Sequence, residues 1–306
     1  MTIVFKASDN VIEKMIKYYE NLRREKTPPY AIFQAQEADT IITLYESKKV
    51  MFQGASADVD ANIWIEMEKK LNNRTIDIKT GKEKKNDNET IDFHKLSTIG
   101  SDEVGTGDYF GPIVVASTYV DKNMIDYLKE LNIDDSKKMT DEYILQVAPT
   151  IMQKIPYSAF ILTNEDYNNL NHEKINMNKI KAILHNKVLL NLKNKNYNYD
   201  KIVVDQFTPE SYYYNYLKDV PNKVLNITFV TKAESKCLSV ACASVISRYI
   251  FLTEMEKISK KINRSIPKGA GENVDIFAKE LVDELGFDAL KNIAKLNFKN
   301  TCKLKS

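Results

Sequence analysis

The stretch SDEVGTGDYFGPIVVAS, residues 101–117, contains two apolar strands joined by a glycine-rich turn. Asp102 and Glu103 lie at the end of the first strand. Successive strand residues point to opposite faces of a sheet, so the two carboxylates need not face one site. Gly105 and Gly107 allow a tight turn whose N–H groups a polyanion can approach, and a carboxylate beside it suits a Mg²⁺ ion that also contacts phosphate. Taken alone, Asp-Glu-x-Gly is more typical of an ordinary strand end.

Two carboxylates further along the chain strengthen the metal hypothesis. Asp205 ends the apolar run in KIVVDQF, and Glu234 lies in KAESK, just before or within the first turn of a long helix. Acids at strand ends and at a helix start can converge, and two divalent ions about 4 Å apart assist in-line phosphodiester hydrolysis. The alternatives are structural: Asp205 is equally typical of a turn or cap, and Glu234 of a helix N-terminus stabilised by the macrodipole.

The apolar runs after residue 95 predict an α/β domain over residues 96–306. Strands are expected in IGSDEVG, IVVASTYV, YSAFILT, KIVVDQF and ITFVTK. Helices are expected at 176–194 and from Ser235 to about Ile262, where small residues permit close packing, with two more helical stretches toward the C-terminus.

The first 75 residues have a different order of elements: strand, helix, three strands, helix. This order predicts a small α+β module with helices on one face of a sheet. Its Tyr30, Phe33 and Phe52 belong either to the core or to an exposed binding face. Residues 76–95 are almost entirely charged or polar, which indicates a solvated linker.

Composition excludes several classes of protein. The chain has 306 residues, 44 Lys+Arg against 42 Asp+Glu, and 43% hydrophobic residues, which is enough for cored domains and excludes global disorder. An apolar run of about 18 residues is absent, so we expect no transmembrane helix and no membrane partner. The N-terminus lacks the pattern of a secretory signal. Three cysteines, Cys237, Cys242 and Cys302, favour a reduced cytoplasmic protein.

The residues resemble a known family. The segments DEVGTGDYFGPIVVAS, DDSKKMTDE, IVVDQF, KAESK, SVISR and PKGAG, in this order, resemble ribonuclease HIII, a bacterial relative of ribonuclease HII. The segment YESKKVMFQG resembles part of the TATA-binding-protein-like extension that distinguishes HIII from HII. The resemblance implies an RNase-H-like catalytic domain, with a mixed central sheet flanked by helices, plus a small TATA-binding-protein-like domain that binds substrate.

The resemblance also implies an activity. The family cleaves the RNA strand of RNA/DNA hybrids endonucleolytically with Mg²⁺ or Mn²⁺, leaving 5′-phosphate and 3′-hydroxyl ends. Asp102, Glu103, Asp205 and Glu234 match its four acidic residues, which are both catalytic and metal-binding. We expect Asp102 and Asp205 to bridge the metal ions, and Glu103 and Glu234 to complete coordination or orient water.

Substrate contacts follow from the same resemblance. The turn of Gly105, Thr106 and Gly107 matches the family's segment that contacts the ribose 2′-hydroxyl, the group that distinguishes RNA from DNA. Ribonuclease HII has Gly-Arg-Gly there, so Thr106 favours HIII. Ser136, Lys138 and Lys268 are expected to contact substrate phosphates, although lysines and glycine loops are more often simply exposed surface. For His185, on a helix with an apolar side, a structural or surface position is more typical than catalysis.

Two alternatives remain open at this point: incision at single ribonucleotides in DNA, as by ribonuclease HII, and non-catalytic binding of hybrids. Thr106 and the N-terminal module argue against the first, and an unused cluster of repelling carboxylates argues against the second. The expected partner is an RNA/DNA hybrid, bound by a monomer with no obligate protein partner. A near-neutral net charge of +2 requires that phosphate contacts come from local basic patches.

Overall fold

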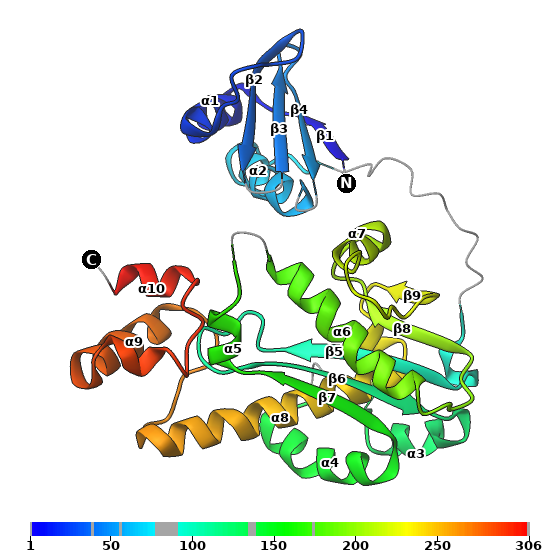
Figure 1. Cartoon of the computed structure of the whole chain (residues 1–306). Helices are drawn as coiled ribbons and strands as arrows, with labels where there is room; N and C mark the ends of the chain where they lie inside the picture. The colour runs from blue at the N-terminus through cyan, green and yellow to red at the C-terminus, as the bar shows by residue number, and fades with distance from the viewer. Residues whose placement is uncertain are drawn as a thin grey trace. The chain divides into compact units, whose positions relative to one another are not determined.

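The computed structural model describes residues 2–37, 40–54, 57–76, 91–133, 139–172 and 175–304, with backbone only at residue 59. The chain forms two compact units, Met1–Ile91 and Asp92–Ser306, and each is described by itself. Figure 1 shows both, coloured along the chain.

The first unit is a four-stranded antiparallel sheet with both helices on one face (Figure 1). The strand order is β1-β4-β3-β2. The elements are β1 (Thr2–Lys6), α1 (Asp9–Tyr18), η1 (Glu20–Leu22), β2 (Ala31–Glu37), β3 (Thr40–Tyr45), β4 (Lys49–Gly54) and α2 (Ala57–Asn72).

Aromatic residues form much of the core of this unit. Phe33 and Phe52 are 1% and 0% exposed, so the core assignment is correct for both, whereas Tyr30 is 80% exposed. Trp64 of α2 donates a hydrogen bond of 2.9 Å from Nε1 to the hydroxyl of Tyr19, so its polar atom is satisfied within the core. The sheet and both helices therefore share one apolar layer.

The second unit is built on a mixed five-stranded sheet of order β7-β6-β5-β8-β9, in which β7, β6 and β5 are antiparallel and β5, β8 and β9 are parallel. The strands are β5 (Thr98–Val104), β6 (Ile113–Val120), β7 (Tyr157–Leu162), β8 (Lys201–Asp205) and β9 (Ile227–Val230). The helices are η2 (Phe93–Lys95), η3 (Lys122–Met124), α3 (Ile125–Glu130), α4 (Asp141–Lys154), α5 (Asn164–Asn168), α6 (Met177–Lys193), α7 (Glu210–Tyr216), η5 (Ala233–Ser235), α8 (Leu238–Ile262), α9 (Glu272–Leu285), η6 (Phe287–Leu290) and α10 (Lys299–Lys303).

Two helices cover the central strand from opposite sides. α8 packs on β5 and β6, and α6 packs on β5, β6 and β7 (Figure 1). The approach of α8 is close at Gly100, where an added Cβ would lie 2.5 Å from the backbone nitrogen of Val240. Thr98 and Ser239 share a hydrogen bond of 2.8 Å beside it. The small residues of α8 thus let a long helix lie directly on the sheet.

By length and composition α8 is the one helix among the described residues that is apolar enough to cross a membrane. However, 61% of its apolar window is buried inside the protein, and it contacts two strands of the central sheet. Its hydropathy therefore follows from its place in the core.

The predicted linker, 76–95, differs from the structure at its end. Residues 77–90 lie outside the described residues, but Phe93 in η2 is 8% exposed and packs against Val203 and Val240. Asp92 caps this turn by accepting a hydrogen bond from the backbone N–H of His94. The second unit thus begins before residue 96, because one aromatic side chain anchors an otherwise polar stretch to the core.

Candidate active site

Asp102 lies on the face of β5 that α8 covers. Burial and the negative charge of Glu103 raise the pKa of Asp102, a hydrogen bond with Ser244 of α8 acts against that rise, and the charge of Asp205 adds to it. The strand alternation explains this placement, because Thr98, Gly100 and Asp102 alternate with residues that face α6. Asp102 is therefore a desolvated carboxylate close to other acids.

Asp205 lies beside Asp102 at the carboxyl ends of two parallel strands. The register of β5 and β8 pairs Ser101 with Val204, so the next residues of the two strands are Asp102 and Asp205. Ligands of open α/β sheets bind at this edge. Asp205 Oδ1 also accepts a hydrogen bond of 2.8 Å from the backbone N–H of Ala233, which fixes the carboxylate against η5.

Glu234 is placed by η5, directly before α8 rather than in its first turn. Its side chain is 8% exposed. Because its neighbour Ala233 is hydrogen-bonded to Asp205, the chain brings Glu234 to the same edge of the sheet as Asp205. The structure thus gives Glu234 a buried position next to the strand end, which a simple solvated helix cap would not have.

Glu103 points to the opposite face of the sheet, where α6 supplies two partners. Its Oε1 forms an ion pair with Lys181, and its Oε2 lies 2.8 Å from His185 Nε2. An ionised carboxylate only accepts hydrogen bonds, so Nε2 donates. Burial alone would raise the pKa of Glu103, but the hydrogen bond and charge of His185 and the charge of Lys181 lower it.

His185 and Lys181 are residues that sequence analysis did not assign to the site. His185 is 0% exposed, and its Nδ1 shares a hydrogen bond of 2.7 Å with Ser101. Lys181 lies with Nζ 4.1 Å from the ring centroid of Phe207. The available signal was their spacing: two residues that can carry positive charge, four positions apart, share one side of the helix.

The glycine-rich turn follows β5 directly. Gly105 has φ +87°, and an added Cβ would lie 2.2 Å from the carbonyl oxygen of Pro112, so glycine is required there. Gly107 is exposed and has nothing within 4 Å of an added Cβ. Thr106 between them is partly buried. The turn therefore has a rigid first residue and an open tip that a nucleic-acid backbone can approach.

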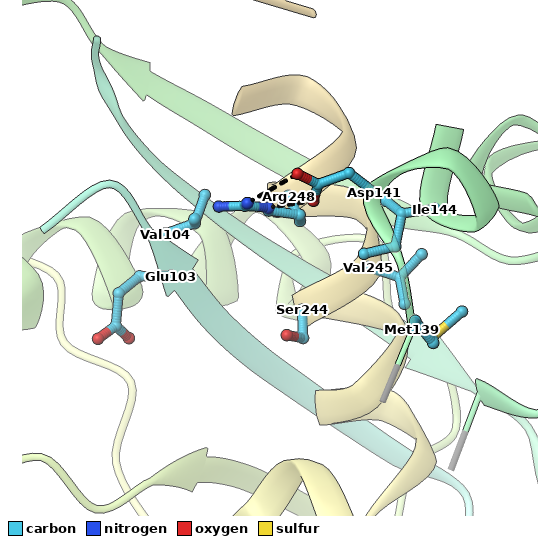
Figure 2. Close-up of a pocket in the computed structure, with 8 residues that line it drawn as sticks. All are labelled: Glu103, Val104, Met139, Asp141, Ile144, Ser244, Val245 and Arg248. Carbon is cyan, nitrogen blue, oxygen red and sulfur yellow. Dashed lines mark hydrogen bonds and ion pairs between the residues drawn. The ribbon is translucent and has the colours of Figure 1, made fainter. Parts of the chain in front are cut away.

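A cavity of about 200 Å³ is lined by residues of β5, α4 and α8 (Figure 2). Its lining residues are Glu103, Val104, Met139, Asp141, Ile144, Ser244, Val245 and Arg248. In Figure 2 the Arg248 guanidinium meets the Asp141 carboxylate, at distances of 2.9 and 3.1 Å. Lys268, a predicted phosphate contact, forms an ion pair with the same Asp141 carboxylate. The predicted contacts Ser136 and Lys138 lie outside the described residues.

The donor set at the strand ends fits a hard divalent cation in part. Asp102 and Asp205 supply carboxylate oxygens, the ligands that Mg²⁺ and Mn²⁺ take, and a cation would relieve their mutual repulsion. In the described parts of the chain, no three His, Cys, Asp or Glu side chains gather closely enough to hold a metal ion. Glu103 is turned to Lys181 and His185 instead. The fit therefore rests on Asp102 and Asp205.

Comparisons with known proteins agree with this architecture. Residues 99–301 match the ribonuclease HII family, and residues 2–75 match a domain of unknown function, DUF3378. Ribonuclease HIII of Bacillus cereus is 40% identical, with 98% of this chain and 96% of the relative covered. The chain belongs to the ribonuclease HII/HIII family. Ribonuclease HIII of Bacillus thuringiensis subsp. konkukian shows the same identity and coverage.

Solved structures of this family share the fold. Bst-RNase HIII, determined in complex with Mn²⁺, has a TM-score of 0.69 and 36% identity, with 100% of this chain and 98% of that chain covered. Aquifex aeolicus RNase H3, at 22% identity and a TM-score of 0.54, supports the fold alone. The predicted α/β architecture with an N-terminal sheet domain is confirmed. The likeness of the first domain to TATA-binding protein stays a prediction.

Proposed function

We propose that the chain is a divalent-metal-dependent endoribonuclease that hydrolyses the RNA strand of RNA/DNA hybrids and leaves 5′-phosphate and 3′-hydroxyl ends. The observation that carries this proposal is the side-by-side placement of Asp102 and Asp205 at the carboxyl ends of β5 and β8. Two partly buried carboxylates at a sheet edge, next to an open glycine turn, suit phosphodiester chemistry with a cation. Forty-per-cent identity to ribonuclease HIII proteins over nearly the whole chain supports it.

Each part of the site has a role in this proposal. Asp102 and Asp205 hold the metal ion, either Mg²⁺ or Mn²⁺, which when bound lowers the pKa of water and stabilises charge on the phosphate. Ser244 and the N–H of Ala233 orient these two carboxylates. Glu103 and Glu234 complete the acidic set. The Gly105–Gly107 turn contacts the ribose, and Lys268, Ser136 and Lys138 contact phosphates.

The proposal extends to partners and location. The substrate is an RNA/DNA hybrid, bound by a monomer in the cytoplasm without an obligate protein partner. The first unit adds binding surface for the hybrid. It carries exposed polar and aromatic side chains, among them Gln53 of β4 and Tyr30 in the turn before β2, that suit contact with a nucleic-acid backbone.

A gel assay tests the proposal directly. The chain is incubated with a uniform RNA/DNA hybrid and with a DNA duplex that holds one ribonucleotide, each in Mg²⁺ and in Mn²⁺. We expect efficient cutting at several positions of the RNA strand, and weak or no incision of the single-ribonucleotide duplex. Preferred incision at the single ribonucleotide would instead assign ribonuclease HII activity, and binding of the hybrid without cleavage in either metal would overturn the enzymatic proposal.

A further inference from the structure

Lys295 is a fully buried lysine that the proposed chemistry does not use. Its side chain is 0% exposed. Its Nζ donates hydrogen bonds to the main-chain carbonyl oxygens of Asp108, at 2.8 Å, and Gly111, at 2.5 Å. Both acceptors belong to the segment that directly follows the Gly105–Gly107 turn. Lys295 thus anchors the segment after the turn through hydrogen bonds inside the protein.

The backbone around Lys295 holds the same segment. The N–H of Lys295 donates to the carbonyl of Tyr109 at 2.8 Å, and the N–H of Gly111 donates to the carbonyl of Ile293 at 2.8 Å. Phe110 and Ala294 form an isolated antiparallel bridge. A C-terminal segment of the chain therefore fixes the residues that follow the turn from one side.

Further contacts restrict Gly111 itself. Asn164 Nδ2 donates to its carbonyl oxygen at 2.9 Å, so this oxygen accepts from two buried side chains. Gly111 has φ +80°, and an added Cβ would lie 2.4 Å from Met255 Sδ of α8. The carbonyl thus has little freedom to reorient.

Burying a lysine here is energetically unfavourable unless its contacts compensate. A methionine would fill a similar volume without desolvating an ammonium group, but it would leave the Asp108 carbonyl without this donor. The ammonium group of Lys295 is therefore explained by its hydrogen bonds to two main-chain carbonyls rather than by packing. Turn geometry matters most where the backbone itself contacts the substrate, because small misplacements of contacting groups reduce rates strongly.

We propose that Lys295 is a positioning residue for ribose selectivity: by bridging the carbonyl oxygens of Asp108 and Gly111, it fixes the conformation in which the Gly105–Gly107 turn meets the RNA strand. This inference rests on the proposed function. It assigns selectivity in part to a residue that does not touch the substrate. It also explains why the C-terminal segment, distant in sequence from the acids, packs against the turn.

The test compares two substrates on one protein preparation. The first is a uniform RNA/DNA hybrid, and the second is the same hybrid with a single 2′-deoxynucleotide in the RNA strand, scored at the bond next to it. We expect Lys295→Met to reduce the ratio of the two kcat/KM values roughly tenfold. An inactive or unfolded fraction cancels in this ratio, so a merely structural role would leave it unchanged.

Lys291→Met is the matched control, because Lys291 lies in the same segment with 59% of its side chain exposed; it should keep the wild-type ratio. A folded Lys295→Met protein with the wild-type ratio would overturn the inference. If Lys295→Met does not fold, Asn164→Ala decides, since it removes the other donor to Gly111: a reduced ratio supports the inference and an unchanged ratio overturns it. Failure of the wild type to cut the uniform hybrid would instead count against the proposed function.

Discussion

Asp102 and Glu103 are neighbours in sequence, yet β5 turns them into different environments. Asp102 faces α8 and other acids, and its pKa is raised by burial and their charge. Glu103 faces Lys181 and His185, which lower its pKa. The strand period of two predicts such a separation, but only the structure shows that α6 supplies the cations. The site therefore holds one carboxylate repelled by neighbouring acids, Asp102, and one neutralised by neighbouring cations, Glu103.

Asp102→Asn should stabilise the metal-free protein, more at pH 8 than at pH 4. The folded-state pKa of Asp102 is raised above the value of 3.8 for an unperturbed Asp, so the stability of the wild type falls as pH rises above that value, whereas asparagine does not ionise. Thermal melts in EDTA at both pH values measure the difference. Asp219→Asn, at an exposed position, is the control and should show little change. Equal shifts for Asp102→Asn at the two pH values would contradict the account.

The pH dependence of stability that Lys295 contributes is opposite in sign to that of Asp102. Burial lowers the pKa of Lys295 from 10.5 to about 7, so the unfolded chain binds the proton more tightly between these values. Its contribution to stability is full above pH 10.5 and is lost as pH falls through about 7. Denaturant unfolding at pH 7 and pH 9.5 should show a rise in the free energy of unfolding of the wild type relative to Lys295→Met. Identical pH dependence of the two proteins would contradict a lowered pKa of Lys295 in the folded state.

At the scale of elements, the sequence predicts the strands but not which helix packs on which face of the sheet. All five apolar runs after residue 95 became β5 to β9, and the helix expected at 176–194 is α6, Met177–Lys193. Apolar periodicity specifies which residues are buried. It does not specify which helix covers which face, so the pairing of Glu103 with α6 and of Asp102 with α8 required the tertiary structure. Lys295 was missed because its burial depends on carbonyl partners distant in sequence.

The glycine turn gives a matched pair of variants. Gly105→Ala places a Cβ 2.2 Å from a backbone oxygen at φ +87° and should destabilise the protein by roughly 1–3 kcal/mol. Gly107→Ala has open space and should leave Tm nearly unchanged. If the tip contacts the substrate backbone, Gly107→Ala raises KM for the hybrid. Thermal melts and steady-state kinetics separate the two effects, and a Tm loss at Gly107 as large as at Gly105 would be inconsistent with this geometry.

At the scale of the whole molecule, we propose that the first unit contributes to hybrid binding and the second unit carries out the chemistry. The second unit holds the glycine turn and all four acids of the proposed site, and the first unit has its own core. We expect removal of residues 1–80 to raise KM for the hybrid roughly tenfold or more while kcat changes less, because tethered contacts increase effective affinity. Steady-state kinetics at two salt concentrations measure this, since lost phosphate contacts also weaken the salt dependence. An unchanged KM would refute the division.

We propose that Asp102 and Asp205 together carry a metal-dependent hydrolysis. The most direct measurement is the cleavage rate of a uniform RNA/DNA hybrid by the double variant Asp102→Asn, Asp205→Asn, with hybrid binding followed by fluorescence anisotropy. We predict a loss of at least about a thousandfold in rate with binding retained. Cleavage by the double variant at the wild-type rate would contradict the claim.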